Sequence, residues 1–487
     1  MFGITRAPDF DRDGLTWFNV AQPLTLADLR GRLVILDFWT FCCINCVHVQ
    51  PTLRRLEESF PGQVVVIGVH SPKFDHERDE AELAHAIARY GIAHPVVHDP
   101  DLRLWDDYAV RAWPTLVFIS PDGYVIGQLA GEPHPDLLLQ GLGDMARQFF
   151  ARGELKPQPL PLTPVTEDGG RLRFPGKIKP CPEDDGTKLW ALADTGHNQV
   201  ALLTDEGEEF LRYGTGEAGN RDGAAHEASF DGPEGLACDG RFIYVADTRN
   251  HAIRRIDRQT GWVDTLAGLG CRGAILRQPE PALGAALASP WDLEIVDGVL
   301  YFANAGSHQI GAVDLSTGMV RPVAGSGGES IIDGDGDNAA LAQPSGLSLA
   351  PEGNALFFTD SETSAVRRLC LRSGRVETLV GHGLFDFGYA NGPLDRAKMQ
   401  HPLGVAAVDG RVFVADSYNS AIRVISLADR MVSDLDGLDC ADPVCRPPSE
   451  PAGIAADGPH RLLVSDTNNH RIVEYRLDRG TMRTWAE

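Results

Sequence analysis

Two cysteines three residues apart, Cys43 and Cys46, form the pattern with the clearest chemical potential in this sequence. They stand where an apolar run, residues 33–39, gives way to apolar residues at helical spacing. On the first turn of a helix, positions i and i+3 share one face, so the two sulfur atoms can reach bonding distance. The spacing predicts a redox-active Cys43–Cys46 disulfide, and no metal or other cofactor is expected.

The start of a helix also suggests different roles for the two cysteines. Free backbone N–H groups and the helix dipole stabilise a thiolate at a helix N-terminus. Cys43 is therefore the predicted nucleophile, and Cys46, one turn deeper, is the predicted resolving thiol. Cys42 adds a third sulfur atom, which is open to three interpretations: a packing residue, a competing partner or a site of glutathionylation.

The segments around this pair predict an α/β domain over residues 1–150. Three apolar runs are typical of strands that helices cover on both faces: 33–39, 64–69 and 115–119. Residues at helical spacing lie between them, and Gly91 is a predicted helix stop. The turn at 120–123 separates two strand-like runs by too few residues for a helical crossover, so that pair is predicted to be antiparallel.

A repeated pattern fills residues 171–487, after a proline-rich linker over 151–170. Six copies of a template such as Ala-Asp-Thr-x-Asn-x-x-Ile recur at intervals of 50–57 residues, and their acidic or amide positions are Asp194, Asp247, Asn304, Asp360, Asp416 and Asp466. Each copy predicts two strands joined by a tight turn whose Asp side chain accepts backbone N–H bonds. Such units bury their faces by packing radially, as propeller blades.

Composition limits the classes of partner and the location. The formal net charge of -24 repels phosphate backbones and anionic lipids, so neither nucleic acid nor membrane is an expected partner. The segment Met1–Arg6 has no basic stretch followed by an apolar one, so the expected location is cytoplasmic. Nine cysteines with one tight cluster predict reduced thiols and a single special site.

These motifs resemble known families. The template Asp-[Ser/Thr]-x-Asn-x-x-Ile, with Pro-x-Gly upstream of it, resembles the NHL repeat, which implies a six-bladed β-propeller over 171–487. The stretch from Leu36 to Cys46, with Trp113-Pro114-Thr115, is similar to thioredoxin-like proteins of the TlpA type. The combination in this order, with Cys-Cys-Ile-Asn-Cys, resembles the NHL repeat-containing protein 2 family.

The resemblance implies roles for further residues. Asp37 is a carboxylate inside an apolar strand, where an isolated charge is costly, and the family pattern makes it the acid that assists proton transfer to Cys46. Pro114 matches the cis-proline that faces the disulfide. Trp39 and Trp113 belong to the same motifs and are expected to be neighbours of the cysteine pair. Ile44-Asn45 replaces the Gly-Pro of reducing thioredoxins, so the direction of electron flow stays open.

Two readings of the function follow. In the first, a thiol-disulfide oxidoreductase module acts on a protein thiol or disulfide, and the propeller binds a protein partner. In the second, both modules are a non-enzymatic scaffold with an inert or structural Cys43–Cys46 pair. A zinc half-site is disfavoured because no second ligand pair follows at ligand spacing.

Other candidate positions have simpler explanations. Four histidines recur near the template and either present a metal site or serve the turn, and the repetition favours the turn: His197, His251, His308 and His470. Asn304 and Asp360 depart from the template, so looser turns are expected there. Cys440 and Cys445 are expected to be free thiols in a reducing compartment.

Overall fold

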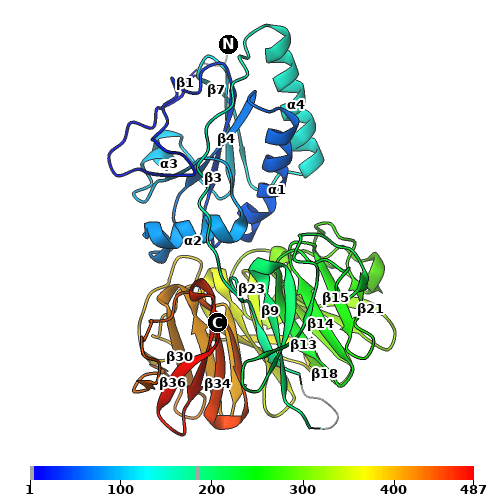
Figure 1. The fold of residues 1–487 in the computed structure, drawn as a ribbon. Helices are drawn as coiled ribbons and strands as arrows, with labels where there is room; N and C mark the ends of the chain where they lie inside the picture. Colours follow the sequence, from blue (N-terminus) through cyan, green and yellow to red (C-terminus); the bar gives the residue numbers. More distant parts are fainter. Residues whose placement is uncertain (1–4, 182–185) are drawn as a thin grey trace. The chain divides into compact units, whose positions relative to one another are not determined.

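A computed structural model describes residues 5–181 and 186–487 of the chain. Residues 1–4, at the beginning of the N-terminal segment considered above, lie outside the described part. The chain divides into two units, Met1–Glu167 and Asp168–Glu487. The first contains one open sheet covered by helices, and the second contains six smaller sheets (Figure 1). This is the expected thioredoxin-like fold followed by a six-bladed β-propeller.

The first unit is built on a seven-stranded sheet. Its strands are β1 (Thr5–Arg6), β2 (Thr16–Phe18), β3 (Leu33–Trp39), β4 (Val64–His70), β5 (Val96–His98), β6 (Thr115–Ile119) and β7 (Tyr124–Ala130). Their order is β1-β7-β6-β3-β4-β5-β2. The central strand β3 runs parallel to β4 and antiparallel to β6. β6 and β7 form the antiparallel pair that the turn at 120–123 predicts.

Helices cover both faces of this sheet, because alternate side chains of each strand point to opposite faces. Residues of α1 (Ile44–Ser59) and α4 (Pro135–Ala151) pack with Leu33 and Ile35 of β3 on one face. Residues of α3 (Arg103–Asp107) pack with Leu36 and Phe38 on the other. α2 (Glu80–Tyr90) ends at Gly91, whose φ of 61° confirms the predicted helix stop. Within the described ranges, no helix has both the length and the apolar character needed to cross a bilayer.

The second unit contains six antiparallel blades of four strands. The blades comprise, in order, β8 (Ile178–Pro180), β9 (Leu189–Asp194), β10 (Gln199–Thr204) and β11 (Glu209–Tyr213); β13 (Pro233–Cys238), β14 (Phe242–Asp247), β15 (Ala252–Asp257) and β16 (Trp262–Ala267); β18 (Pro290–Val296), β19 (Val299–Asn304), β20 (Gln309–Asp314) and β21 (Met319–Ala324); β23 (Pro344–Leu349), β24 (Ala355–Asp360), β25 (Ala365–Cys370) and β26 (Arg375–Val380); β28 (Gly404–Val408), β29 (Arg411–Asp416), β30 (Ala421–Ser426) and β31 (Met431–Asp434); and β33 (Pro451–Ala456), β34 (Arg461–Asp466), β35 (Arg471–Arg476) and β36 (Thr481–Ala486).

Each of the last five blades also carries a two-residue edge strand. These edge strands are β12 (Gly223–Ala224), β17 (Glu280–Pro281), β22 (Gly334–Asp335), β27 (Gly392–Pro393) and β32 (Asp439–Cys440). The first four pair antiparallel with the fourth strand of their blade, whereas β32 pairs parallel with β36.

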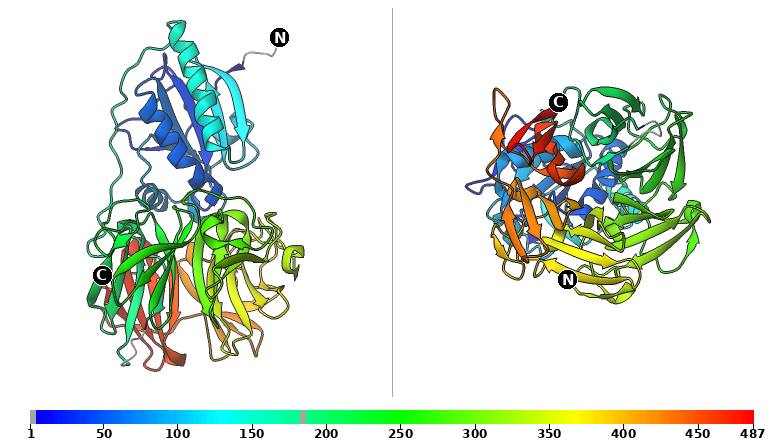
Figure 2. Two further views of the ribbon diagram at one scale, coloured as in Figure 1. Left: turned by 90° about the vertical axis from the view of Figure 1, so that its right-hand side faces the viewer. Right: turned by 90° about the horizontal axis from the view of Figure 1, so that it is seen from below.

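The first strands of the blades close the ring. Each contacts the first strand of the next blade, and β33 of the last blade contacts β8 of the first. The blades therefore surround a common axis, which is visible when the propeller is viewed end-on (Figure 2).

The repeated Asp or Asn has one role in all six blades. Its side-chain oxygen accepts a backbone N–H from the segment that leads into the same blade. Asn304 Oδ1 accepts the N–H of Ala288 at 2.9 Å, and Asp360 Oδ1 accepts that of Ala342 at 2.7 Å. Asn304 and Asp360, the two departures from the template, thus accept the same kind of bond as the repeated Asp of the other four blades. The looser turns expected after these two residues stay a prediction.

The recurring histidines serve the turns and the contacts between blades. His251, His308 and His470 have left-handed φ values of 51–54° at the end of the turn. Their Nδ1 atoms accept backbone N–H groups of the neighbouring blade at 3.0–3.1 Å. His197 Nδ1 lies 2.9 Å from Asp194 Oδ2 within its own turn. The turn role favoured for these residues is confirmed.

Two disulfides correct the expectation of reduced thiols. Cys181 is bonded to Cys238, and Cys440 is bonded to Cys445 instead of lying free. Cys181 directly follows β8, and Cys238 is the last residue of β13, the first strand of the adjoining blade. The two cysteines are 57 residues apart in sequence, so only the packing of the blades brings them together. The cysteines that form no disulfide are Cys42, Cys43, Cys46, Cys271 and Cys370.

Candidate functional site

The Cys43–Cys46 pair lies at the junction of β3 and α1. Cys43 is the N-cap residue of α1, with extended backbone angles (φ −83°, ψ 109°), and it is partly exposed. Cys46, on the first turn, is completely buried. Burial, interaction with the neighbouring Cys43 thiol and the nearby Asp37 carboxylate raise the pKa of Cys46 well above that of an ordinary thiol. The site thus presents one accessible sulfur atom with a second one behind it.

Asp37 lies on β3, where it is completely buried. Gln50 Nε2 donates a hydrogen bond to its Oδ2 at 2.7 Å. Burial raises the pKa of Asp37 to about 7, although His94 and the Gln50 hydrogen bond oppose the rise. A carboxyl group with a pKa near neutrality can accept and release a proton under physiological conditions. Asp37 is therefore suited to exchange protons with the buried Cys46 thiol.

Two buried nitrogen atoms, on Trp39 and His94, lie near Asp37. In the sheet, Asp37 is the register partner of Gly68 on β4. A Cβ atom on Gly68 would lie 3.0 Å from Trp39 Nε1 and 3.3 Å from His94 Nε2. These two nitrogen atoms and Asp37 Oδ1 are buried and have no hydrogen-bond partner in residues 5–181 or 186–487. The missing side chain at Gly68 therefore lets a polar cluster form next to the carboxyl group.

His94 connects this cluster to α1. Its Nδ1 lies 3.7 Å from Glu57 Oε2, and the Glu57 side chain is 28% exposed. Glu57 Oε1 accepts the N–H of Val66 at 3.0 Å, which fixes the carboxylate. Asn19 Nδ2 donates to the backbone oxygen of His94 at 2.8 Å and holds the segment before β5 in place. His94 thus stands between the buried Asp37 and a carboxylate that reaches solvent.

Cys42 is buried and therefore poorly placed for thiol-disulfide exchange. It is 3% exposed, and its N–H donates to Glu77 Oε1 at 2.9 Å. Glu77 Oε2 accepts the N–H groups of Lys73 and Phe74, so one buried carboxylate ties the loop before the cysteine pair to the segment after β4. Of the three roles left open for Cys42, this burial favours packing. Ile44 is buried as well.

The other predicted neighbours lie at the same end of β3. The Trp113–Pro114 peptide bond is cis, as the resemblance implies. Pro114 directly precedes β6, which pairs antiparallel with β3, so Pro114 lies at the end of β3 from which the chain continues to Cys43. Trp113 Nε1 donates to the backbone oxygen of Ser71 at 2.9 Å. Asn45, inside the Cys-x-x-Cys motif, is partly exposed.

Sequence reasoning missed the residues that surround Asp37. Gln50 had a detectable signal, because it lies four residues after Cys46 and therefore on the same face of α1. His94 and Glu57 had none, since they meet only when the segment before β5 packs beside α1.

The comparisons with known proteins cover both units. Residues 31–125 match a family model described as thioredoxin-like, and residues 399–425 match the NHL repeat model. NHL repeat-containing protein 2 of Gallus gallus is 37% identical over 512 residues, which make up 97% of this chain and 70% of the chicken protein. The chain belongs to the NHL repeat-containing protein 2 family.

The proteins similar to this chain differ in length, and some match only its first unit. Protein SUPPRESSOR OF QUENCHING 1, chloroplastic, of Arabidopsis thaliana is 37% identical over 500 residues, covering 98% of this chain and 47% of the plant protein. The chain thus spans about half the length of that relative. Thiol-disulfide oxidoreductase ResA of Halalkalibacterium halodurans is 26% identical over 108 residues, or 22% of this chain and 57% of ResA.

Proposed function

We propose that the thioredoxin-like unit is a thiol-disulfide oxidoreductase that acts on a protein substrate. The observation that carries this proposal is a pair of thiols at the start of α1, with Cys43 partly exposed at the N-cap and Cys46 fully buried near Asp37. The similarity to ResA, which is named a thiol-disulfide oxidoreductase, supports the same class of reaction.

The proposed reaction has two exchange steps. The Cys43 thiolate attacks one sulfur atom of a substrate disulfide, which forms a mixed disulfide and releases the other substrate sulfur as a thiol. Cys46 then attacks Cys43 Sγ, so the Cys43–Cys46 disulfide forms and the second substrate thiol leaves. The substrate gains two electrons and two protons, and the cysteine pair loses them. The same steps in reverse oxidise a substrate dithiol.

Proton transfer accompanies the second step. Cys46 must lose its proton to become a nucleophile, and its raised pKa makes an adjacent base necessary. We assign this role to Asp37, whose carboxyl group has a pKa of about 7. His94 and Glu57 give the proton an onward route to solvent. Pro114 and Trp113, at the same end of β3, are the proposed lining of the substrate position.

The propeller is the proposed binding module for a protein partner. Phe385, in the loop before β27, is 72% exposed and offers an apolar contact. The net charge of -24 argues against nucleic acid and anionic membranes as alternatives. The cytoplasmic location stays a prediction, which cell fractionation tests; the two disulfides remove the support that reduced thiols would have lent it.

The test is reduction of glutathione disulfide by the pre-reduced full-length chain. The wild-type chain should form the Cys43–Cys46 disulfide as the product, identified by mass spectrometry after digestion without reductant, and Cys43→Ser should lose this product. Cys271→Ser is the matched control, because Cys271 is an exposed free cysteine outside the site. Activity of Cys43→Ser equal to wild type contradicts the proposal. A scaffold would show no exchange and would keep its partners when both Cys43 and Cys46 are replaced by serine.

A further inference from the structure

The two disulfides of the propeller differ in accessibility. Cys181 is completely buried, and Cys238 packs at the edge of the same hydrophobic cluster. In contrast, Cys445 is exposed and Cys440 partly exposed, and Val444 beside Cys445 is 74% exposed. Thiol-disulfide exchange requires that an attacking thiolate reach a sulfur atom. Of the two disulfides, Cys440–Cys445 is therefore the one open to attack.

The two disulfides also differ in what they hold together. Cys440–Cys445 spans 5 positions of the chain, whereas Cys181–Cys238 spans 57 and joins two blades. A short ring restricts the unfolded chain less than a long loop does. The propeller therefore depends less on Cys440–Cys445, and this bond can open without loss of the fold.

A small cavity beside the exposed disulfide is lined by both cysteines, by Asp442 and by three arginines, Arg446, Arg471 and Arg483, among other residues. Each arginine is paired with a carboxylate, on Glu487, Asp466 and Glu474 respectively, so its charge is already balanced. Exposure of the Cys445 sulfur is therefore what opens this bond to an incoming thiolate.

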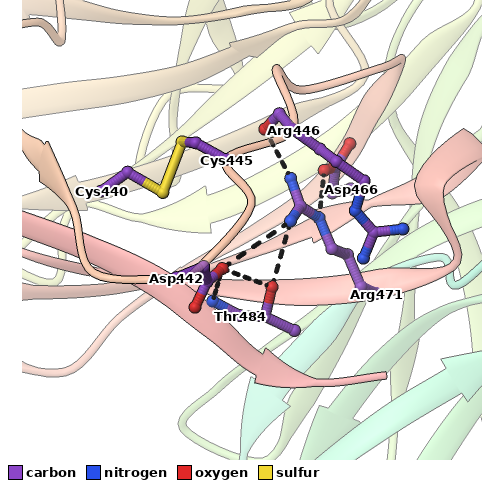
Figure 3. Close-up of a disulfide and its surroundings, with 7 residues drawn as sticks. All are labelled: Cys440, Asp442, Cys445, Arg446, Asp466, Arg471 and Thr484. Carbon is purple, nitrogen blue, oxygen red and sulfur yellow. Dashed lines mark hydrogen bonds and ion pairs between the residues drawn. A yellow bond between two sulfur atoms is a disulfide. The ribbon is translucent and has the colours of Figure 1, made fainter.

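The ring closed by this disulfide restrains the last blade (Figure 3). It contains Asp442, whose Oδ2 accepts the N–H and the hydroxyl of Thr484 on β36 at 2.8 and 2.7 Å. Asp442 also lies 4.0 Å from Arg471 Nη1, and Arg471 Nε donates to Asp466, the repeated acid of this blade, at 2.8 Å. Opening the ring therefore releases a segment that holds β36.

From these observations we infer that Cys440–Cys445 is a substrate disulfide of the Cys43–Cys46 pair, in the same chain or in a second copy, and that its reduction loosens β36. The inference rests on the proposed function. Cys43 attacks Cys445, the exposed sulfur, and Cys440 leaves as a thiol. Cys46 then displaces Cys445 from Cys43. Two electrons and two protons pass to Cys440 and Cys445, and the Cys43–Cys46 disulfide forms.

The test traps the mixed disulfide in the full-length Cys46→Ser variant, which lacks the resolving thiol. Digestion without reductant, followed by mass spectrometry, should identify a peptide that joins Cys43 to Cys440 or Cys445. Its yield should exceed that of any link to Cys181 or Cys238 by about ten-fold or more, because those sulfur atoms are shielded. The matched control adds Cys440→Ser and Cys445→Ser and should lose the linked peptide. Cys46→Ala replaces Cys46→Ser if serine prevents folding.

The outcomes separate this inference from the proposed function. The linked peptide supports the inference in either form. If it comes from a monomer, the exchange takes place within one chain, and if it comes from a covalent dimer, the exchange takes place between two copies. Absence of the link overturns it if Cys43 in the same sample still reacts with glutathione disulfide. If Cys43 reacts with neither, the proposed function fails as well. In the wild-type chain, reduction of Cys440–Cys445 should speed hydrogen exchange at the Thr484 amide, and unchanged exchange contradicts the loosening of β36.

Discussion

At the scale of one residue, Asp37 suits the proposed chemistry but lowers the stability of the fold when its carboxyl group is ionised. Its carboxyl group is completely buried and receives a hydrogen bond from Gln50, but no lysine or arginine in the described part of the chain is paired with it. The folded chain therefore favours the protonated carboxyl group, and its pKa rises to about 7. The same property that suits Asp37 for proton transfer makes it costly once the carboxyl group ionises.

Asp37→Asn should stabilise the thioredoxin-like unit in a pH-dependent way. The folded pKa of about 7 exceeds the ordinary value of 3.8, so the folded state binds the extra proton between these pH values, and stability falls as the pH rises through them. The variant should gain about 4 kcal/mol near pH 8 and little near pH 4. Hydrogen exchange of the buried β3 amides measures the gain.

Asp106→Asn is the control for this measurement, because Asp106 is exposed on α3 and its replacement should leave exchange unchanged. Equal stabilisation by Asp37→Asn at both pH values would show that ionisation of Asp37 is not the cause.

At the scale of the element, the blades couple the repeated acid to a buried cation. In three blades the residue seven positions after the repeated Asp is an arginine that pairs with it at 2.8–3.0 Å: Arg254, Arg367 and Arg423. The third blade has Asn304 instead, and Gly311 occupies the arginine position. The Phe302 ring fills this space, since a Cβ atom on Gly311 would lie 2.2 Å from it. The third blade thus lacks both the carboxylate and the arginine that pairs with it in those three blades.

Asn304→Asp should therefore destabilise the third blade, because it buries a carboxylate that has no arginine opposite it. Burial raises the pKa of such a carboxyl group, so the loss should grow as the pH rises above about 4 and reach roughly 3 kcal/mol near pH 8. Denaturant unfolding of the full chain at pH 5 and pH 8 measures the difference from wild type. Asn304→Ser is the neutral control, and a loss for it that changes with pH in the same way would count against the argument.

At the scale of the whole molecule, the propeller closes without any blade that combines main strands from both ends of the second unit. All four main strands of the first blade come from the beginning of the second unit, and those of the last blade come from its end. Side chains join the two blades: Trp190 and Trp485 lie with ring centroids 6.3 Å apart, and Thr467 Oγ1 donates to the backbone oxygen of Pro175 at 2.9 Å. Cys181–Cys238 then fixes the first blade to the second.

Replacing Cys181 and Cys238 by alanine should lower the free energy of unfolding of the propeller by about 4 kcal/mol, because the bond closes a long loop. The matched variant with alanine at Cys440 and Cys445 should lose only about 2 kcal/mol, since that ring is short. Denaturant unfolding of the full-length variants gives both values. Equal losses would contradict the view that Cys181–Cys238 contributes more to the stability of the fold than Cys440–Cys445 does.

Much of this architecture could be predicted from local patterns. The apolar runs of β3, β4 and β6, the stop at Gly91 and the six repeats depend on residues that are neighbours in sequence, and periodicity reports such neighbours directly. The positions of Cys43 and Cys46 at the start of a helix followed from the same local signals. The roles of Asp37 and Pro114 came from a family resemblance instead.

The sequence by itself thus determined the succession of strands and helices, the number of blades and the place of the cysteine pair, because these depend on short-range spacing. Only the tertiary structure decided that His94 stands between Asp37 and Glu57, that Cys42 is buried beside Glu77, and that the disulfides form. Each of these contacts joins segments that the chain separates, and nothing in the spacing of the residues states which segments will adjoin after folding.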